Sequence, residues 1–332
     1  MKKKDVALAL SSGGPRGFAY IGAIEELEAR GYRITSVAGS SIGSLVGGIY
    51  AAGRLADFKE WLYSLDTWKV FSLMDLSIGK NHFVKGEKII HAIMEIVPDV
   101  NIEDLPIPYR AVATDLYTGE EVLFERGKLF TAIRASISIP SLFRPVKYGL
   151  STLIDGGIVN CLPVDKVERH PDDILIAFDV NDVNVAEIKA ILESEHRAQR
   201  EDERFHIAKR LEMKELIEEI RGKNELGLVE RLKYVGSHGL SLVKDIVGYQ
   251  KLYDEDTALD YGDTYYDLLD RTFSLQNHRN TELMLRLCPP DVLVRMPFDE
   301  YGEIADYAKA REISDMGRQL MSDALDRYEA TK

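Results

Sequence analysis

The chain has 332 residues, of which 45% are hydrophobic and 29% charged, so it can bury a sizeable core and is not globally disordered. Its 42 Lys and Arg against 55 Asp and Glu give a formal net charge of −13, which argues against nucleic acid as a partner because phosphate binding needs a basic face. The same charge disfavours electrostatic attraction to anionic membranes. A peripheral membrane contact would therefore need local apolar surface or the cluster Lys2-Lys3-Lys4.

The cysteine and histidine patterns predict no metal site and no cofactor. Cys161 and Cys288 lie far apart in neither a metal-binding nor a redox spacing, and the seven histidines form no H-x-x-x-H pattern. No stretch approaches the roughly 20 apolar residues of a membrane span, and the apolar run 6–10 is too short for a signal-peptide core. We therefore expect a soluble, cytoplasmic protein.

The first predicted strand, 5–10, runs directly into a glycine-rich turn at 11–17, and a helix is predicted over 18–27. A strand, a glycine-rich turn and a helix indicate an anion site, because backbone N–H groups at the start of a helix point at negative charge.

Two nucleotide-binding motifs do not fit this turn. Ser12 replaces the first glycine of a dinucleotide fingerprint, and the Gly-Lys-Ser/Thr ending of a P-loop is absent. We interpret the turn as an oxyanion hole in which the N–H groups of Gly13 and Gly14 stabilise an alkoxide. A merely tight turn between strand and helix is the alternative.

Residues 39–43 spell G-x-S-x-G with Ser41 at the centre, between a predicted strand at 33–38 and a predicted helix at 45–52. The pattern is typical of a nucleophile elbow, in which the serine hydroxyl is exposed above a sheet. The residues two before and two after the serine come close together in such a turn, so glycine is needed at both positions. The N–H of Ile42 is a further candidate oxyanion donor.

Further elements follow in chain order. Helices are predicted over 57–65, 86–97 and 129–136, and strands over 109–114 and 121–124. An extended segment, 146–154, then delivers Asp155-Gly156-Gly157. Asp155 is the candidate general base that accepts the proton of Ser41. Asp-Gly is also a favoured hairpin dipeptide, so a turn aspartate is the alternative.

The character of the chain changes after a buried strand at 174–180. Residues 181–232 alternate in charge and carry apolar residues at roughly helical spacing, which is typical of a solvated amphipathic helix pair. A mobile cap, or a surface for a membrane or a partner, is the functional alternative. A helix at 271–286, a strand at 291–296 and a helix at 307–328 complete the chain. We thus expect a catalytic core over 1–180, a charged helical insertion over 181–270, and a C-terminal segment over 271–332 that packs back on the core.

Four blocks in order resemble the motifs of the patatin-like phospholipase family, over approximately residues 6–180. They are Ser11 to Gly17, Gly39 to Ser44, Ala135 to Pro140, and Asp155-Gly156-Gly157 with Leu162-Pro163. The resemblance implies a three-layer α/β/α sandwich with a mostly parallel central sheet. It also implies a lipid acyl hydrolase that cleaves phospholipids or other long-chain acyl esters through an acyl-serine, with a Ser–Asp dyad and neither histidine nor calcium.

Carried over by this resemblance, Ser41 is the nucleophile, Asp155 the base, and Gly13 with Gly14 the oxyanion donors. The sequence departs from the family where Ser12 replaces the first of three glycines. An ordinary aspartate with a pKa near ~3.9 is a weak base at neutral pH, so we expect burial in a lipid-lined cleft to raise the pKa of Asp155.

Several alternatives stay open. Arg16 either holds the glycine loop or contacts a lipid phosphate, and we favour the first. His278 follows the acid in chain order, as in a hydrolase or acyltransferase with a histidine base, but it lies in a predicted helix. A non-catalytic lipid-binding regulatory protein on the same fold is the third hypothesis. The oligomeric state is not predicted.

Overall fold

The computed structural model describes residues 4–73, 82–84, 87–183, 265–298, 300–301 and 304–331, together with a few residues between 185 and 211. The chain divides into two compact units, residues 1–183 with 270–332, and residues 184–269. The charged helical segment expected over 181–270 lies mostly outside the described residues, and its role as a cap stays a prediction.

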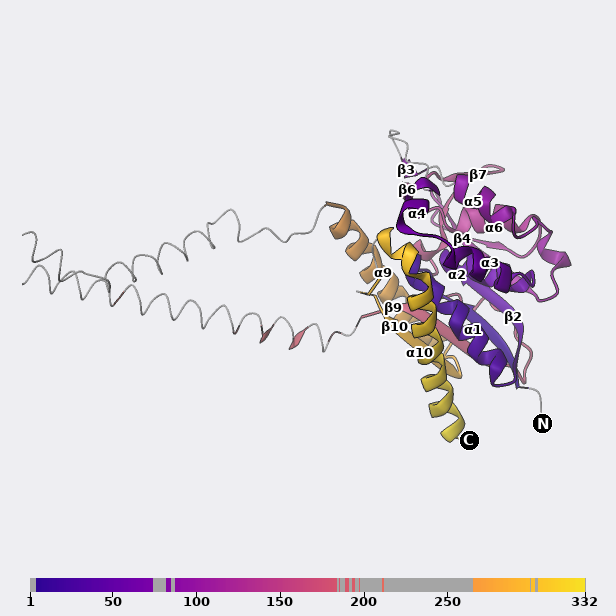
Figure 1. The fold of residues 1–332 in the computed structure, drawn as a ribbon, viewed down its shortest axis with the longest axis vertical. Helices are drawn as coiled ribbons and strands as arrows, with labels where there is room; N and C mark the ends of the chain where they lie inside the picture. Colours follow the sequence, from indigo (N-terminus) through magenta and orange to yellow (C-terminus); the bar gives the residue numbers. More distant parts are fainter. Residues whose placement is uncertain are drawn as a thin grey trace, which may run out of the picture. The chain divides into compact units, whose positions relative to one another are not determined.

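Within the described residues of the first unit, eight strands form one mixed sheet in the order β10-β9-β1-β2-β4-β8-β7, with β5 also paired to β4 (Figure 1). Five strands run parallel to one another: β10 (Val292–Pro297), β9 (Ile174–Asp182), β1 (Lys4–Leu10), β2 (Tyr32–Ser40) and β4 (Tyr109–Asp115). Three are antiparallel to their neighbours: β5 (Glu121–Phe124), β7 (Val146–Tyr148) and β8 (Ser151–Asp155). Strands β3 (His82–Val84) and β6 (Ser141–Phe143) pair separately.

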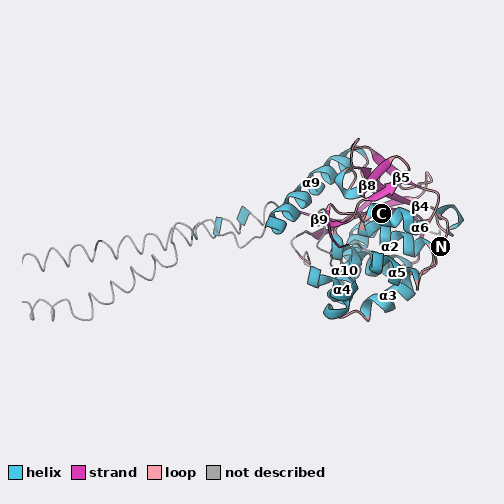
Figure 2. Ribbon diagram, turned by 90° about the horizontal axis from the view of Figure 1, so that it is seen from above, coloured by secondary structure: helices cyan, strands magenta, loops and turns pink. Residues whose placement is uncertain are grey.

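The central strands are apolar on both faces because helices cover both. In β1, Val6, Leu8 and Leu10 belong to one buried cluster, and Ala7 and Ala9 to another. The first cluster is completed by α1 (Ala19–Ala29), α2 (Ile42–Ala51), α6 (Leu129–Ser136) and α10 (Ala310–Ala330), the second by α9 (Tyr265–Leu287). Figure 2 shows α9 on the opposite side of the sheet from α2 and α10. The predicted α/β/α sandwich is thereby confirmed.

The shorter helices of this unit are α3 (Leu55–Tyr63), α4 (Thr67–Leu73) and α5 (Glu87–Met94). Short 3₁₀ segments lie at η1 (Gly14–Phe18), η2 (Ile102–Asp104), η3 (Gly156–Ile158) and η4 (Ile304–Lys309). The predicted elements at 5–10, 33–38, 129–136 and 174–180 agree with β1, β2, α6 and β9.

Two predicted elements differ from the structure. The segment 146–154 is a hairpin of β7 and β8, not one extended strand. The chain reverses at Gly149, whose φ of 58° lies in the left-handed region that a glycine adopts without steric cost. The helix predicted over 307–328 also differs, since it is preceded by η4 and begins at Ala310.

Strand β4 brings two distant segments to one point. Ala113 pairs with Val122 of β5 and with Asp155 of β8, so β5 and β8 lie on opposite edges of β4. Strand β2 also lies opposite β5, and its last residue, Ser40, pairs with Val112. Strand β8 therefore takes up the edge of β4 where β2 leaves it, which sets Asp155 beside the turn after Ser40.

Helices α1 and α10 lie against each other through backbone contact. A Cβ at Gly22 of α1 would overlap the carbonyl oxygen of Ser314, and a Cβ at Gly317 of α10 would overlap the carbonyl of Ala19. Glycine is required at both places because the two helices approach more closely than side chains allow. The C-terminal helix is thus fitted into the layer that also contains α2.

We expect Gly317→Val to destabilise the fold by about 2 kcal/mol or more, because overpacking a tight contact forces backbone shifts. Chemical denaturation followed by circular dichroism measures this loss. Asp315→Ala, at an exposed position of the same helix, is the control and should leave stability nearly unchanged. Equal stability of the two variants would contradict close packing of α1 on α10.

Candidate active site

Ser41 occupies a strained turn between β2 and α2, with φ 52° and ψ −123°. A Cβ at Gly39 would overlap the backbone of Gly43, and a Cβ at Gly43 would overlap the carbonyl oxygen of Leu10. The steric reason expected for both glycines of the motif is therefore present. The Ser41 N–H donates to Ser136 Oγ at 2.9 Å, which ties the turn to the end of α6. A non-glycine residue at positive φ is strained, and such strain concentrates at functional sites.

The side chains of Ser41 and Asp155 are in contact, as expected from the pairing of β2 and β8 with consecutive residues of β4. The Ser41 hydroxyl donates to Asp155 Oδ2 at 2.5 Å, and the Gly157 N–H donates to Oδ1 at 2.7 Å. A Cβ at Gly156 would overlap the carbonyl oxygen of Val112, so the backbone after the aspartate must stay bare. Both carboxylate oxygens are held by hydrogen bonds, and the carboxylate points at the serine.

Burial dominates the electrostatics of this carboxylate. Asp155 is only 4% exposed, and loss of solvation raises its pKa from the ordinary 3.8 to about 7, against the lowering effect of the hydrogen bonds from Ser41 and Gly157. The direction is the one expected from the sequence. A carboxyl group with a pKa near neutrality can both accept and return a proton at neutral pH.

The glycine turn places unengaged backbone donors near the serine. Gly13 has φ 153° and Gly14 has φ 57°, and a Cβ at Gly13 would overlap the side chain of Val180. In the part of the chain that the structure describes, the N–H groups of Gly13, Gly14 and Ile42 donate to no other protein group. All three residues border a pocket that also contains Ser41.

Arg16 is buried beneath this turn. Its Nε donates to the carbonyl oxygen of Val180 at 2.9 Å, and its Nη2 donates to Asn181 Oδ1 at 3.2 Å. These bonds support the interpretation that Arg16 holds the glycine loop against the end of β9.

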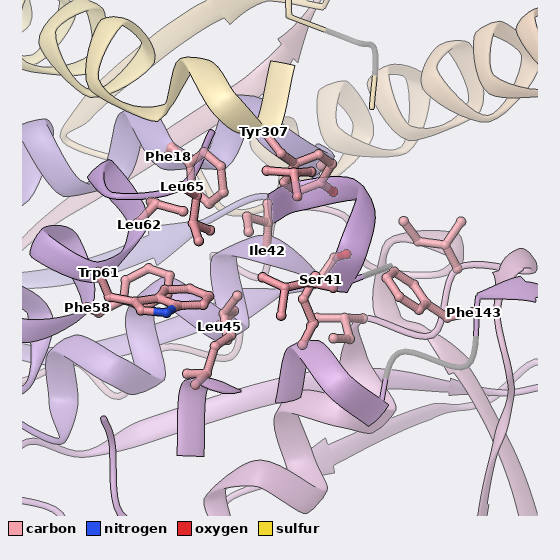
Figure 3. Close-up of a pocket in the computed structure, with 17 residues that line it drawn as sticks. Phe18, Ser41, Ile42, Leu45, Phe58, Trp61, Leu62, Leu65, Phe143 and Tyr307 are labelled. Atoms are coloured by element: carbon pink, nitrogen blue, oxygen red, sulfur yellow. The ribbon is translucent and has the colours of Figure 1, made fainter. Parts of the chain in front are cut away.

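Ser41 lies at the junction of two pockets. The first, here called the apolar pocket, is lined by apolar and aromatic side chains, and its polar side-chain groups are the hydroxyls of Ser41 and Tyr307. They come from η1, α2, α3, α4, α5 and the segment 137–143. Figure 3 shows Ser41 between Phe143 on one side and Leu45, Trp61 and Phe58 on the other. Such a lining suits a hydrocarbon chain and offers little to a polar ligand.

The second, here the polar pocket, opens from the same serine. It contains Asp155, the glycine turn, Arg16 and Asn181, with Ser274 and Asn277 of α9 opposite. Ser41, Gly14, Ile139 and Tyr307 border both pockets. The arrangement separates an apolar compartment from a polar one at a single hydroxyl.

Sequence reasoning missed several residues of this site. Ser136 holds the Ser41 backbone, Ser138 accepts the Asp155 N–H through its carbonyl at 3.0 Å, and Asn181 contacts the glycine turn. The two serines lie in the block 135–140, which resemblance alone singled out. Asn181 has no sequence signal beyond its place at the end of a strand.

His278 does not join the pair. It lies on α9, lines neither pocket, and makes no hydrogen bond to Ser41 or Asp155 among the described residues. It lies near Asp179, whose pKa is raised chiefly by burial. This placement weighs against the histidine-base hypothesis.

The described residues contain no group of three or more His, Cys, Asp or Glu side chains that could hold a metal ion. No helix in the described ranges combines the length and apolar character needed to cross a membrane.

The chain is similar to known proteins over about half of its length. The family model described as patatin-like phospholipase matches residues 8–167. An uncharacterized NTE family protein of Mycobacterium tuberculosis (strain H37Rv) is 49% identical over 176 residues, which cover 53% of this chain and 49% of the relative. The lysophospholipase NTE1 of Debaryomyces hansenii is 32% identical over 192 residues, covering 55% of this chain and 12% of that protein.

Among solved structures, VipD from Legionella pneumophila aligns with a TM-score of 0.36 and 16% sequence identity, covering 65% of this chain and 56% of its own. The chain spans about half the length of the mycobacterial relatives that are 49% identical to it, and much less of the yeast ones.

The raised pKa of Asp155 predicts how stability depends on pH. Between the ordinary pKa of 3.8 and the folded value of about 7, the folded state keeps a proton that the unfolded state has released. The free energy of unfolding therefore falls as the pH rises through this window. Asp155→Asn removes this cost, so we expect it to raise the unfolding midpoint, relative to wild type, more at pH 8 than at pH 4.5. Thermal denaturation at both pH values measures the difference, and an equal shift at both would contradict the raised pKa.

Proposed function

We propose that the chain is a serine lipid acyl hydrolase, with Ser41 as nucleophile and Asp155 as general base. The match of residues 8–167 to the patatin-like phospholipase family model supports the proposal. The observation that carries the proposal is the 2.5 Å hydrogen bond between these two side chains, at the point where the two pockets meet. The matched relatives support a lipid substrate, since one is named a lysophospholipase.

The reaction follows from these positions. Ser41 Oγ attacks the ester carbonyl carbon while its proton passes to Asp155 Oδ2. The N–H groups of Gly13, Gly14 and Ile42 stabilise the negative oxygen of the tetrahedral intermediate. The intermediate collapses when the C–O bond to the alcohol breaks, and the Asp155 carboxylic acid protonates the departing oxygen. An acyl-serine remains.

A water molecule then completes the cycle. Asp155, again a carboxylate, takes a proton from this water as its oxygen attacks the acyl-serine carbonyl. The same backbone donors stabilise the second intermediate, and its collapse returns the proton to Ser41 and releases the fatty acid. A pKa near 7 suits the carboxylate to both halves, because it accepts and donates with little loss at neutral pH.

We assign the two parts of the substrate to the two pockets. The apolar pocket receives the acyl chain, and the polar pocket receives the alcohol that leaves. Phospholipids and other long-chain acyl esters fit this division. Extraction of such a lipid from a bilayer requires a peripheral contact, and exposed apolar side chains such as those of Tyr117 and Leu150 are candidates for it.

The first test is release of p-nitrophenol from acyl esters of graded length. We expect Ser41→Ala and Asp155→Asn each to lower kcat by at least about 10³-fold, because each removes a group that acts on the reacting atoms. Wild type should show an acid limb near pH 7, where Asp155 becomes protonated. Asp173→Asn, a buried aspartate at the other end of the sheet, is the matched control and should retain activity.

The rivals give different outcomes in the same assay. A rate that stays flat down to about pH 4 would contradict the role of Asp155 as base. If His278→Ala abolished turnover while Asp155→Asn only weakened it, the histidine-base hydrolase or acyltransferase would be favoured. Lipid binding without labelling of Ser41 by a serine-reactive phosphonate would favour the non-catalytic lipid-binding protein.

The apolar pocket predicts chain-length preference. We expect Trp61→Ala to raise kcat/KM for a C16 ester relative to a C8 ester by about tenfold, because removal of the indole opens apolar space for added methylenes. Trp68→Ala is the control, since Trp68 is 81% exposed and does not line the pocket. Identical chain-length profiles in the two variants would refute the assignment of this pocket to the acyl chain.

A further inference from the structure

A backbone oxyanion hole works only when its N–H groups point at the position that the negative oxygen will occupy. Gly13 and Gly14 lack the side chain that would restrict their backbone, so the sequence of the turn alone does not fix these planes. We propose that Asn181, at the end of β9, is a positioning residue that sets the Ser12–Gly13 peptide for catalysis. The proposal rests on the function proposed above and assigns a residue to it.

Asn181 holds the carbonyl side of this peptide. Its Nδ2 donates to the carbonyl oxygen of Ser12 at 2.6 Å. In a trans peptide the C=O and the following N–H point in opposite directions, and the described residues contain no cis peptide bond. The bond to Ser12 therefore turns the Gly13 N–H away from Asn181, which frees it to donate within the polar pocket.

Arg16 decides which way round the Asn181 amide lies. A guanidinium only donates, so the amide atom that faces Arg16 Nη2 at 3.2 Å must be the oxygen. The nitrogen is then left to face Ser12. Exchange of the two amide atoms would set two donors together at Arg16 and two acceptors together at Ser12.

Burial and a backbone hydrogen bond hold Asn181 in place. Its side chain is buried, with the residue only 1% exposed, and its backbone N–H donates to Asp179 Oδ1 at 3.0 Å. The preceding carbonyl, of Val180, accepts from Arg16 Nε at 2.9 Å. The Val180 side chain also fills the space that a Cβ at Gly13 would need. The end of β9 thus contacts the glycine turn through the side chains of Val180 and Asn181 and through the carbonyl of Val180.

The test measures kcat per active site. Wild type and Asn181→Ala are titrated with a serine-reactive phosphonate, and steady-state rates on a p-nitrophenyl ester are divided by the titrated sites. We expect kcat to fall about 10- to 100-fold with KM changed by less than about twofold, since full removal of one oxyanion donor costs about 10²–10³. Affinity for a trifluoromethyl ketone bearing the same acyl chain should fall by a similar factor, because its hemiketal oxygen uses the same donors.

A purely structural role would give a different result. It would lower the titrated fraction or the unfolding midpoint and leave kcat per site within about threefold of wild type, which would overturn the proposal. A raised KM with unchanged kcat would also overturn it, because Asn181 would then be a substrate contact. Asn160→Ala is the matched control: Asn160 is equally buried and its side chain bonds Glu121 and Asp165.

Arg16→Lys is a second variant that tests the same role if Asn181→Ala does not fold. A lysine cannot reproduce the two bonds in one plane, so the amide of Asn181 is no longer held and kcat per site should fall at constant KM. The double variant should lose little more than the worse single variant, because the two side chains act on one peptide. Full additivity would overturn the linkage. Wild-type protein that neither titrates nor hydrolyses the ester would refute the proposed function, a result distinct from these.

Discussion

The hydrogen bond between Ser41 and Asp155 depends on the way β4 shares one edge between two partners. Strand β2 occupies that edge as far as Val112, and β8 occupies it from Ala113 onward in the opposite direction. The chain must leave β2 in a sharp turn at this point, and the aspartate at the end of β8 arrives there. Neither a longer β2 nor a longer β8 is compatible with the contact. The glycines around both residues follow from the same crowding.

The contact carries an electrostatic cost that the fold absorbs. The structure places no cation on Asp155 among its described neighbours, and its carboxylate is stabilised by one hydroxyl and one backbone N–H. Removal from water is the largest influence on this group and works against its charged form. Burial of this carboxylate weakens the folded state and makes the carboxylate a stronger base, so stability and the proposed proton transfer make opposite demands on one side chain.

Much of the core could be predicted from sequence because the signals are local. The G-x-S-x-G spacing reflects a collision between residues four apart, and the strands at 5–10 and 174–180 read as buried runs. The β7–β8 hairpin was missed because a single Gly149 inside an apparently extended stretch gives a weak turn signal. The apolar pocket could not be seen at all. Its walls come from helices that pattern alone treats as ordinary amphipathic elements, and only their convergence around Ser41 leaves a space between them.

The contact between Asn181 and the glycine turn could not be predicted from the sequence either. The glycine turn attracts attention by composition, but the residue that contacts its carbonyl lies 169 positions away at the end of another strand. An asparagine in that place has no distinctive pattern. Its importance follows from β1 and β9 being neighbours in the sheet, which is a property of the topology.

The order of the strands also governs how the chain matures during synthesis. Strand β1 is translated well before its neighbour β9 and the helix α10 that fits against α1. The nascent first half therefore has an unsatisfied sheet edge and a bare glycine groove, features that invite aggregation and call for chaperone protection. The same delay leaves the proposed active site incomplete until β9 and α9, which line its polar pocket, have been translated.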